Sequence, residues 1–234
     1  MEHTSRQYER ELQELKDKIL LLGGMVEMMI ASAMKSLLNR DSDLARSVIA
    51  SDPRVDNAEL EIDHLSVSLL ALRQPAASDL RFITTALKIV TDLERIGDLT
   101  VNIAERAIEL NEEPPLKPYI DVPRMASTAA GMVHQALDAF VNRNPAEAQE
   151  VLGQDEGVDR LNVQLFRELL TYMIEDPKSV TRALRITFIA KYLERIADHA
   201  TNIAQMVIYL CEGRDVRHPS AAKLPPGGST PTGL

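Results

Sequence analysis

The sequence predicts an all-α protein built as two tandem three-helix bundles. Apolar residues recur at spacings of three and four through most of the chain, which is the pattern of an amphipathic helix. Breaks rich in proline and asparagine divide this pattern into six stretches, and no strand-like alternation bounded by turns occurs. The second half of the chain also repeats the first. With 45% apolar but only 4% aromatic residues, the core must consist mainly of aliphatic side chains.

Three helices are expected in the first half. The first runs from about residue 5 to residue 38, where the periodic pattern stops at Asn39-Arg40-Asp41. Asp41 or Ser42 can cap the second helix, which ends near Arg73 and which Asp52-Pro53 is expected to interrupt or kink. Ser78 or Asp79 can cap the third helix, and residues 112–115, two glutamates followed by two prolines, end it.

Three more helices are expected over residues 119–142, 145–174 and 179–210. The predicted domains are therefore a first bundle at residues 1–115 and a second bundle at 116–218. Residues 219–234 contain little large apolar surface and much proline and glycine, so a disordered tail is predicted there.

The repeat is visible as matched segments. Leu38 to Asp41 corresponds to Val141 to Asn144 at an offset of 103 positions, and Leu93 to Asp98 corresponds to Leu193 to Asp198 at an offset of 100. A three-residue insertion or deletion before each third helix explains the difference. Two similar bundles follow from this repeat.

Composition excludes several classes of function. The net charge of -9 disfavours nucleic-acid binding, and a single cysteine, Cys211, excludes an internal disulfide framework. The N-terminus is too charged for a secretory signal, and no uninterrupted apolar stretch predicts a membrane span. We expect a cytoplasmic protein that meets a membrane only through its partners.

A carboxylate stripe occurs once in each repeat. Glu94 and Asp98 are four residues apart, so they lie on one helix face, and Asn102 extends the line; Glu194, Asp198 and Asn202 repeat this spacing. Like charges at this spacing mildly destabilise an isolated helix. A solvated face screened by arginines remains the alternative, but the duplication favours a site for hard or borderline divalent or ferric ions.

A second helix must supply the remaining ligands. The repeat points to Asp56 with Glu59 in the first bundle and to Asp159 with Asn162 in the second. Asn162 stands where the first bundle has Glu59, so the second site carries less negative charge. Unequal metal loading of the two sites is therefore predicted.

The two segments that carry the stripes, DLERIGDLTVNIAE and YLERIADHATNIA, resemble the paired acidic motifs of the PhoU family. The resemblance extends over most of the chain, including residues 73–81 and 213–218. It implies two three-helix bundles and a negative regulator of phosphate uptake and of the phosphate-starvation response. It also implies partners, namely the ATPase subunit of a phosphate ABC transporter and a sensor histidine kinase, and a homodimer. Several relatives hold iron or zinc on these motifs, so Glu94, Asp98, Glu194 and Asp198 inherit a ligand role; magnesium or manganese are alternatives.

Two rival interpretations remain. A di-iron oxidase of the helical-bundle type would use repeated ExxH motifs, but the chain has one, Glu61 to His64. A metal-free helical scaffold is the other. No phosphate-binding glycine loop and no catalytic triad pattern is present, so we do not expect an enzyme.

Some histidines and methionines are expected to have structural roles. His199 is expected to lie on the surface or to pack between helices, and not to bind metal. Met25, Met28, Met29 and Met34 are expected to pack in the core, with an adaptable binding surface as the alternative.

Overall fold

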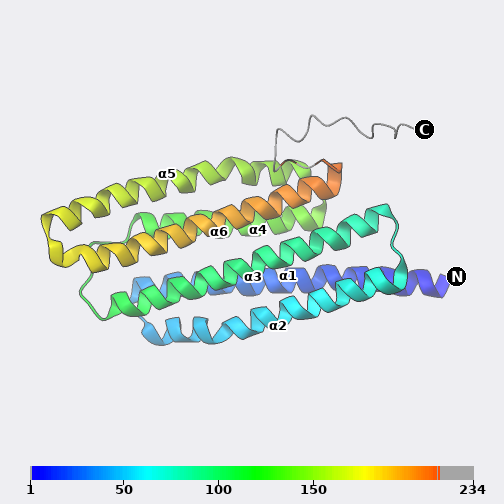
Figure 1. Cartoon of the computed structure of the whole chain (residues 1–234), viewed down its shortest axis with the longest axis horizontal. Helices are drawn as coiled ribbons and strands as arrows, with labels where there is room; N and C mark the ends of the chain where they lie inside the picture. Colours follow the sequence, from blue (N-terminus) through cyan, green and yellow to red (C-terminus); the bar gives the residue numbers. More distant parts are fainter. Residues whose placement is uncertain (1, 215, 217–234) are drawn as a thin grey trace, which may run out of the picture.

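The computed structural model describes residues 2–214 and 216, with side chains from residue 6 onward. Its helices are α1 (Glu2–Asn39), α2 (Ser42–Arg73), α3 (Ala77–Asn111), α4 (Asp121–Asn142), α5 (Pro145–Glu175) and α6 (Val180–Glu212), with a short 3-10 turn, η1 (Pro177–Ser179), before α6. Figure 1 shows the long helices running along the molecule's longest axis. The prediction of six helices is confirmed. The predicted tail at residues 219–234 lies outside the described residues.

The helices form two bundles in contact. Helices α1, α2 and α3 pack on one another, and α4, α5 and α6 do the same. The bundles meet where α3 packs against α6 and where α1 packs against α4 (Figure 1). Among the described residues, α2 and α5 contact only helices of their own bundle and the turn next to α5. Each bundle therefore has one outer helix, and each carboxylate stripe lies on a helix that contacts both bundles.

Aliphatic side chains fill the core, as expected. Leu93 and Ile96 on α3, and Leu193 and Ile196 on α6, are fully buried at equivalent positions. Within Arg6–Asn39, α1 contains a stretch that is long and apolar enough to cross a membrane, but half of that stretch is buried against other helices. In this fold α1 is a core helix.

Three local predictions need adjustment. Helix α2 runs continuously through Pro53, so the structure excludes the interruption, one of the two effects expected there. The fourth helix begins at Asp121 rather than Tyr119. Asp41 caps α2 by accepting a hydrogen bond from the Leu44 amide, as expected, but Asp79 does not cap α3; it accepts a hydrogen bond from the Tyr8 hydroxyl at 3.0 Å. Asp79 thus ties α3 to α1.

The loops after α1 and α4 are built alike. Arg40 and Arg143 occupy equivalent positions and both adopt the left-handed conformation, with φ of 55° and 48°. A side chain there usually costs free energy. The Arg40 guanidinium offsets that cost, because its Nη2 donates to the carbonyl oxygens of Asn111 at 2.6 Å and Glu113 at 2.7 Å, which joins this loop to the end of α3.

Candidate metal centre

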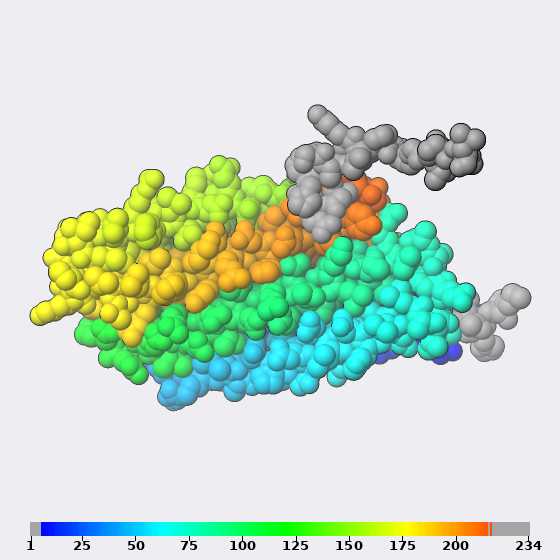
Figure 2. Space-filling model, viewed as in Figure 1, coloured from blue at the N-terminus to red at the C-terminus, as the bar shows by residue number. Residues whose placement is uncertain are grey.

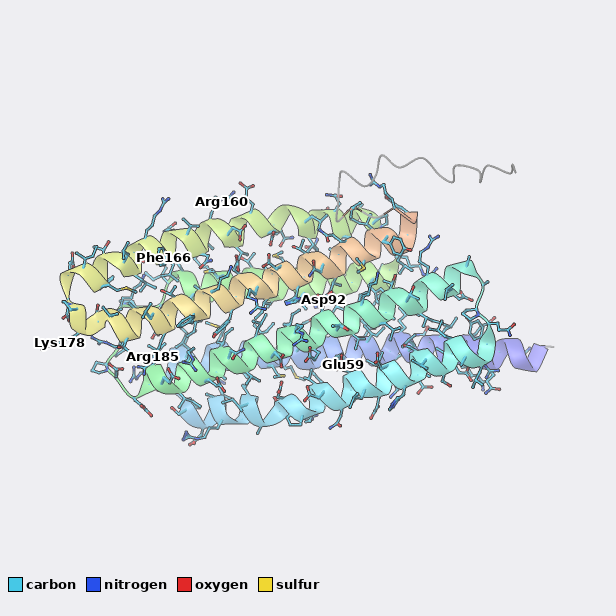
Figure 3. The ribbon with its side chains drawn as sticks, viewed as in Figure 1. Glu59, Asp92, Arg160, Phe166, Lys178 and Arg185 are labelled. Atoms are coloured by element: carbon cyan, nitrogen blue, oxygen red, sulfur yellow. The ribbon has the colours of Figure 1, made fainter. Side chains whose placement is uncertain are left out.

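The first acidic cluster lies between α2 and α3. The two helices approach closely at Gly97, where an added Cβ would lie 3.3 Å from Cγ1 of Val55 and 3.9 Å from Oδ1 of Asp52. The acids of α2 and α3 next to this close contact therefore face one another. Figure 3 labels Glu59 on α2, next to α3. We call Asp52, Asp56, Glu59, Glu94 and Asp98 the first cluster.

Burial and mutual repulsion act on this cluster together. The Glu94 side chain is only 18% exposed, whereas that of Asp98 is 42% exposed, so the stripe does begin at the edge of the buried face. Burial, and then the charges of Asp98, Glu59 and Asp56, raise the pKa of Glu94. Burial and neighbouring carboxylates raise the pKa of Asp52 and of Glu59 in the same way. Keeping these carboxylates ionised therefore costs free energy.

One cation partly screens the first cluster. Nε of Arg95 lies 3.4 Å from Oε2 of Glu94, and its Nη1 lies 3.3 Å from Oδ2 of Asp98. The Arg95 side chain is mostly exposed, so water weakens both ion pairs. The screening expected for a solvated face is therefore present, but it does not reach Asp52, whose buried Oδ1 has no hydrogen-bond partner among the described residues.

The second cluster repeats the arrangement between α5 and α6. It consists of Asp155, Asp159, Glu194 and Asp198. Asp198 is an exposed residue, but the protein atoms around its carboxylate, followed by the charges of the other three acids, raise its pKa to about 6. The same causes raise the pKa of Asp155, while the neighbouring Thr201 hydroxyl opposes this rise. The Thr201 hydroxyl forms no hydrogen bond with Asp155, and Oδ1 of Asp155 has no hydrogen-bond partner in the described part of the chain.

A lysine neutralises part of the second cluster. Nζ of Lys191 lies 2.5 Å from Oε2 and 2.6 Å from Oε1 of Glu194. In the first cluster Arg95 shares its charge between two acids over longer distances. Each cluster therefore has one cation beside it, and the two differ in the number of acids, five against four, and in how closely the cation approaches its carboxylate.

The residues fit an oxygen-liganded cation, although they are not arranged as a finished site. Carboxylates are the ligands that hard cations prefer, and both clusters contain a buried aspartate oxygen that lacks a donor. Within residues 6–214 and 216, however, no group of three or more histidine, cysteine or acidic side chains converges closely enough to hold one metal ion. Side-chain rotation would have to accompany binding.

The three predicted amides differ in their contacts. Nδ2 of Asn102 donates to the backbone oxygen of Asp98 at 2.9 Å. Asn202 points across to α3, where its Nδ2 donates to Oδ1 of Asp92 at 3.3 Å. Asn162 lines a surface groove together with Lys191. The structure thus brings the predicted acids together, whereas Asn202 turns toward Asp92 of the other bundle.

Sequence reasoning missed Asp52 and Asp155. Each stands four residues before a predicted ligand, Asp56 or Asp159, and they are 103 positions apart. The spacing rule that identified the third-helix stripes therefore could have found them on the second helices. Thr201, which lies next to Asp155, carries no comparable signal.

Other features have structural roles. Glu61 and His64 are exposed on α2, and Glu61 bonds to Lys18 at 2.8 Å, so the single ExxH motif does not face a bundle interior. Nδ1 of His199 lies 2.8 Å from Oδ1 of Asp92, which confirms packing between helices. Figure 3 labels Asp92 on α3, next to α6.

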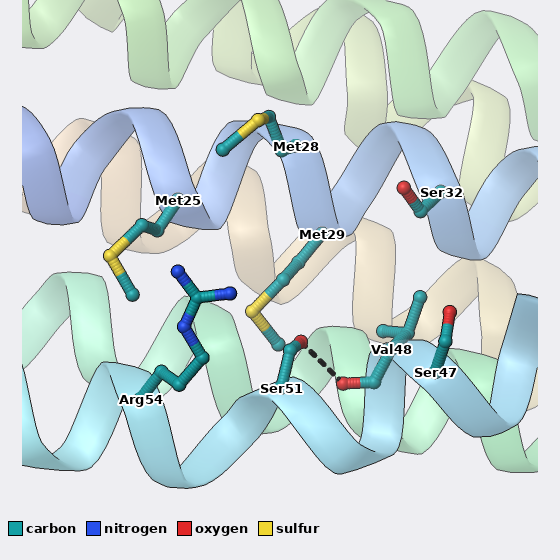
Figure 4. Close-up of a pocket in the computed structure, with 8 residues that line it drawn as sticks. All are labelled: Met25, Met28, Met29, Ser32, Ser47, Val48, Ser51 and Arg54. Atoms are coloured by element: carbon teal, nitrogen blue, oxygen red, sulfur yellow. Dashed lines mark hydrogen bonds between the residues drawn. The ribbon is translucent and has the colours of Figure 1, made fainter.

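The methionines of α1 divide between core and surface. Met29 and Met34 are buried, as predicted, but Met28 is 65% exposed. Met25, Met28 and Met29 line a pocket between α1 and α2, shown in Figure 4, with Arg54 and Ser51 on the opposite helix. The Ser51 hydroxyl donates to the Val48 backbone oxygen at 2.6 Å, so it is already satisfied.

Comparisons with known proteins agree with this architecture. Residues 19–107 and 122–207 each match the PhoU domain. The phosphate-specific transport system accessory protein PhoU homolog of Pseudomonas aeruginosa is 45% identical over 217 residues, which is 92% of this chain and 90% of that protein. Its counterpart in Aquifex aeolicus is 43% identical over 89% of this chain and 95% of that protein.

Two solved structures have the same fold. The crystal structure of PhoU from Pseudomonas aeruginosa superposes with a TM-score of 0.86 at 43% identity, covering 88% of this chain and all of that one. The phosphate transport system regulatory protein PhoU from Streptococcus pneumoniae gives a TM-score of 0.84 at 28% identity, covering 90% of this chain and all of that one. The chain therefore belongs to the PhoU family, whose compared members are named as accessory or regulatory proteins of phosphate transport and not as enzymes.

Proposed function

We propose that the protein is a metal-binding adaptor in the cytoplasm that negatively regulates phosphate uptake and phosphate-starvation signalling. In this role it links the ATPase subunit of a phosphate ABC transporter to a sensor histidine kinase. The accessory and regulatory roles named for its relatives support the link to phosphate transport. The duplicated acidic clusters, each with a buried and unpartnered aspartate oxygen, support the metal.

The acids of each cluster come from two helices, so the net charge of the cluster controls how tightly those helices pack. Asp52, Asp56 and Glu59 on α2 repel Glu94 and Asp98 on α3, and Asp155 and Asp159 on α5 repel Glu194 and Asp198 on α6. A bound iron, zinc, manganese or magnesium ion would supply the positive charge that cancels this repulsion. The outer helices α2 and α5 would then be fixed on their bundles, which gives partners a defined surface.

Thermal unfolding tests the metal step. Protein treated with a chelator should melt at a higher temperature after addition of iron or zinc, because only the folded chain brings these acids together. Asp98→Asn and Asp198→Asn should each remove part of this gain, whereas Asp17→Asn on the exposed face of α1 should not. If metal raises the melting temperature of all four proteins equally, the clusters are not the sites.

Unequal loading of the two sites is tested by the same variants. Elemental analysis after purification without a metal-affinity tag should show a larger loss of metal in Asp98→Asn than in Asp198→Asn, because the second cluster has one acid fewer and Lys191 lies closer to Glu194 than Arg95 lies to its two acids. Equal losses would contradict the inequality, and absence of metal from the wild-type protein would favour the plain scaffold.

The adaptor role needs a partner assay. Wild-type protein should bind the transporter ATPase subunit and the cytoplasmic part of the kinase in a pull-down, and a variant with alanine at Glu94, Asp98, Glu194 and Asp198 should bind more weakly. Undiminished binding by that variant would separate the adaptor role from the metal. We also propose a homodimer, and sedimentation velocity over a range of protein concentrations will measure it.

A further inference from the structure

The outer surface of the second bundle carries an unusual row of exposed apolar side chains. Val163, Phe166 and Leu170 follow one another on α5 at spacings of three and four, so they form one stripe. Leu184 and Phe188 lie on the neighbouring helix α6 and are also exposed. Figure 2 shows α5 and α6 side by side on this face, and Figure 3 labels Phe166 there. Contiguous apolar surface of this kind marks interaction sites in soluble proteins.

Part of this surface is hollowed into a groove of about 430 Å³ between the two helices. Phe166 and Phe188 are 48% and 49% exposed. Phe188 stacks on Tyr192 one turn along α6, with ring centroids 6.4 Å apart. Rigid, half-exposed aromatic side chains are typical anchors of protein interfaces. The groove is lined by Asn162, Val163, Phe166, Arg167, Thr187, Phe188 and Lys191.

The first bundle shows that the fold does not need these aromatic residues. The position of Phe166 corresponds to Asp63 on α2, and the position of Phe188 corresponds to Lys88 on α3. Asp63 is exposed, so the same place in the same fold can carry a charge. Packing of the bundle therefore does not explain why Phe166 and Phe188 are apolar.

The charges around the groove indicate what it binds. None of the described residues that line it is acidic, although the chain as a whole has a net charge of -9. Arg167 and Lys191 lie at its edges; Lys191 is paired with Glu194, while Arg167 has no carboxylate within ion-pair distance in the described part of the chain. A second copy of this groove would bring like charges together, so a two-fold contact of groove on groove is disfavoured.

We propose that the α5–α6 groove is the docking site for an amphipathic acidic helix of a partner protein. Apolar side chains of that helix cover Phe166 and Phe188, and a carboxylate on its flank pairs with Arg167. This recognition resembles other cases in which an apolar helix face fills a groove. The inference rests on the proposed adaptor function, since it states where and by what chemistry one partner of the adaptor binds.

A peptide assay on the whole chain tests the groove directly. The probe is a fluorescent amphipathic peptide with leucine on one face and glutamate on its flanks, and a second peptide has lysine in place of glutamate. The acidic peptide should bind the wild-type protein about tenfold more tightly than it binds the variant Phe166→Ser/Phe188→Ser. Arg167→Glu should weaken the acidic peptide and strengthen the basic one.

The first bundle supplies a matched control. Leu60 and Val67 are exposed apolar residues on α2 that correspond to Val163 and Leu170 on α5. Leu60→Ser/Val67→Ser removes similar exposed apolar surface and should leave peptide affinity unchanged. Circular dichroism should show the same helix content in all variants. Equal binding by the wild type and the Phe166→Ser/Phe188→Ser variant, or no preference for the acidic peptide, would overturn the proposal.

A parallel pull-down separates this proposal from the adaptor function. If the wild type and both serine double variants bind the transporter ATPase subunit or the kinase equally well, the groove is wrong and the adaptor function stands. If the wild type binds neither partner, the adaptor function fails and the peptide result alone decides the groove. Self-association in sedimentation that Phe166→Ser/Phe188→Ser abolishes would assign the groove to a second copy and refute the proposed occupant.

Discussion

Helices α1 and α4 lie close together at Gly23, and this contact between the bundles can be tested quantitatively. A Cβ at this position would lie 2.3 Å from Cδ1 of Leu137, a buried residue of α4. At the adjacent Gly24 an added Cβ would meet nothing within 4 Å. Alanine at either position gains the same helix propensity, so the two substitutions differ only in this contact.

The expected magnitudes follow from these two environments. Glycine inside a helix costs about 1 kcal/mol relative to alanine, so Gly24→Ala should raise the free energy of unfolding by about 1 kcal/mol. Gly23→Ala makes the same gain but forces the buried Leu137 side chain to move, and overpacking a core costs about 1 to 3 kcal/mol. The Gly23→Ala protein should therefore be less stable than the Gly24→Ala protein by about 1 to 3 kcal/mol.

Urea unfolding followed by circular dichroism measures these differences. Leu137→Ala removes the obstructing methyl groups, so adding Gly23→Ala to that background should recover the gain seen at Gly24. The reasoning is refuted if Gly23→Ala stabilises the wild type as much as Gly24→Ala does. It is equally refuted if the penalty persists when residue 137 is alanine.

Three further predictions concern single groups. Burial and Asp79 raise the pKa of Tyr8 to about 12, so the folded chain keeps a proton that the unfolded chain loses near pH 10. The free energy of unfolding should therefore fall between pH 10 and 12. Melting curves over this range should show a smaller fall for Tyr8→Phe. The pKa of Asp198 is raised from 3.8 to about 6, so between these values the folded chain binds a proton that the unfolded chain does not. Chelator-treated protein should therefore gain stability as the pH falls from 7 toward 4. A melting series in which Asp198→Asn shows the same gain would contradict this. Arg40→Ala and Arg40→Gly both lose the hydrogen bonds to the end of α3, but only alanine is strained in the left-handed conformation. The free energy of unfolding of Arg40→Ala, measured in urea, should therefore be lower than that of Arg40→Gly by about 1 kcal/mol, and equal values would contradict this.

The periodic pattern and the repeat were sufficient to predict the architecture, because a helix that packs with one face carries apolar residues at spacings of three and four on that face. They were less reliable at Pro53. A proline inside a helix costs about 3 kcal/mol in isolation. Here buried residues on either side of it, Val48 and Val55, hold α2 against the bundle, so tertiary packing decides the outcome.

The candidate site was predictable where one helix carries the pattern and unpredictable where two helices meet. Glu94 and Asp98 follow from spacing alone, and the same rule applied to α2 leads to Asp52. The pairing of Asp92 with His199 could not be predicted, because it depends on which faces of α3 and α6 meet between the bundles. The bond from the Asn202 amide to Asp92 depends on the same meeting of helices, so spacing alone places Asn202 on the stripe.

The peptide at residues 112–120 joins α3 to α4 and so makes the contact between the bundles intramolecular. Two separate chains would associate through α1 with α4 and α3 with α6 only above a threshold concentration, whereas a short tether holds the partners at a high effective concentration. Dilution therefore does not separate the two halves. The two acidic clusters are always present in a one-to-one ratio in the same particle, however little of the protein a cell contains.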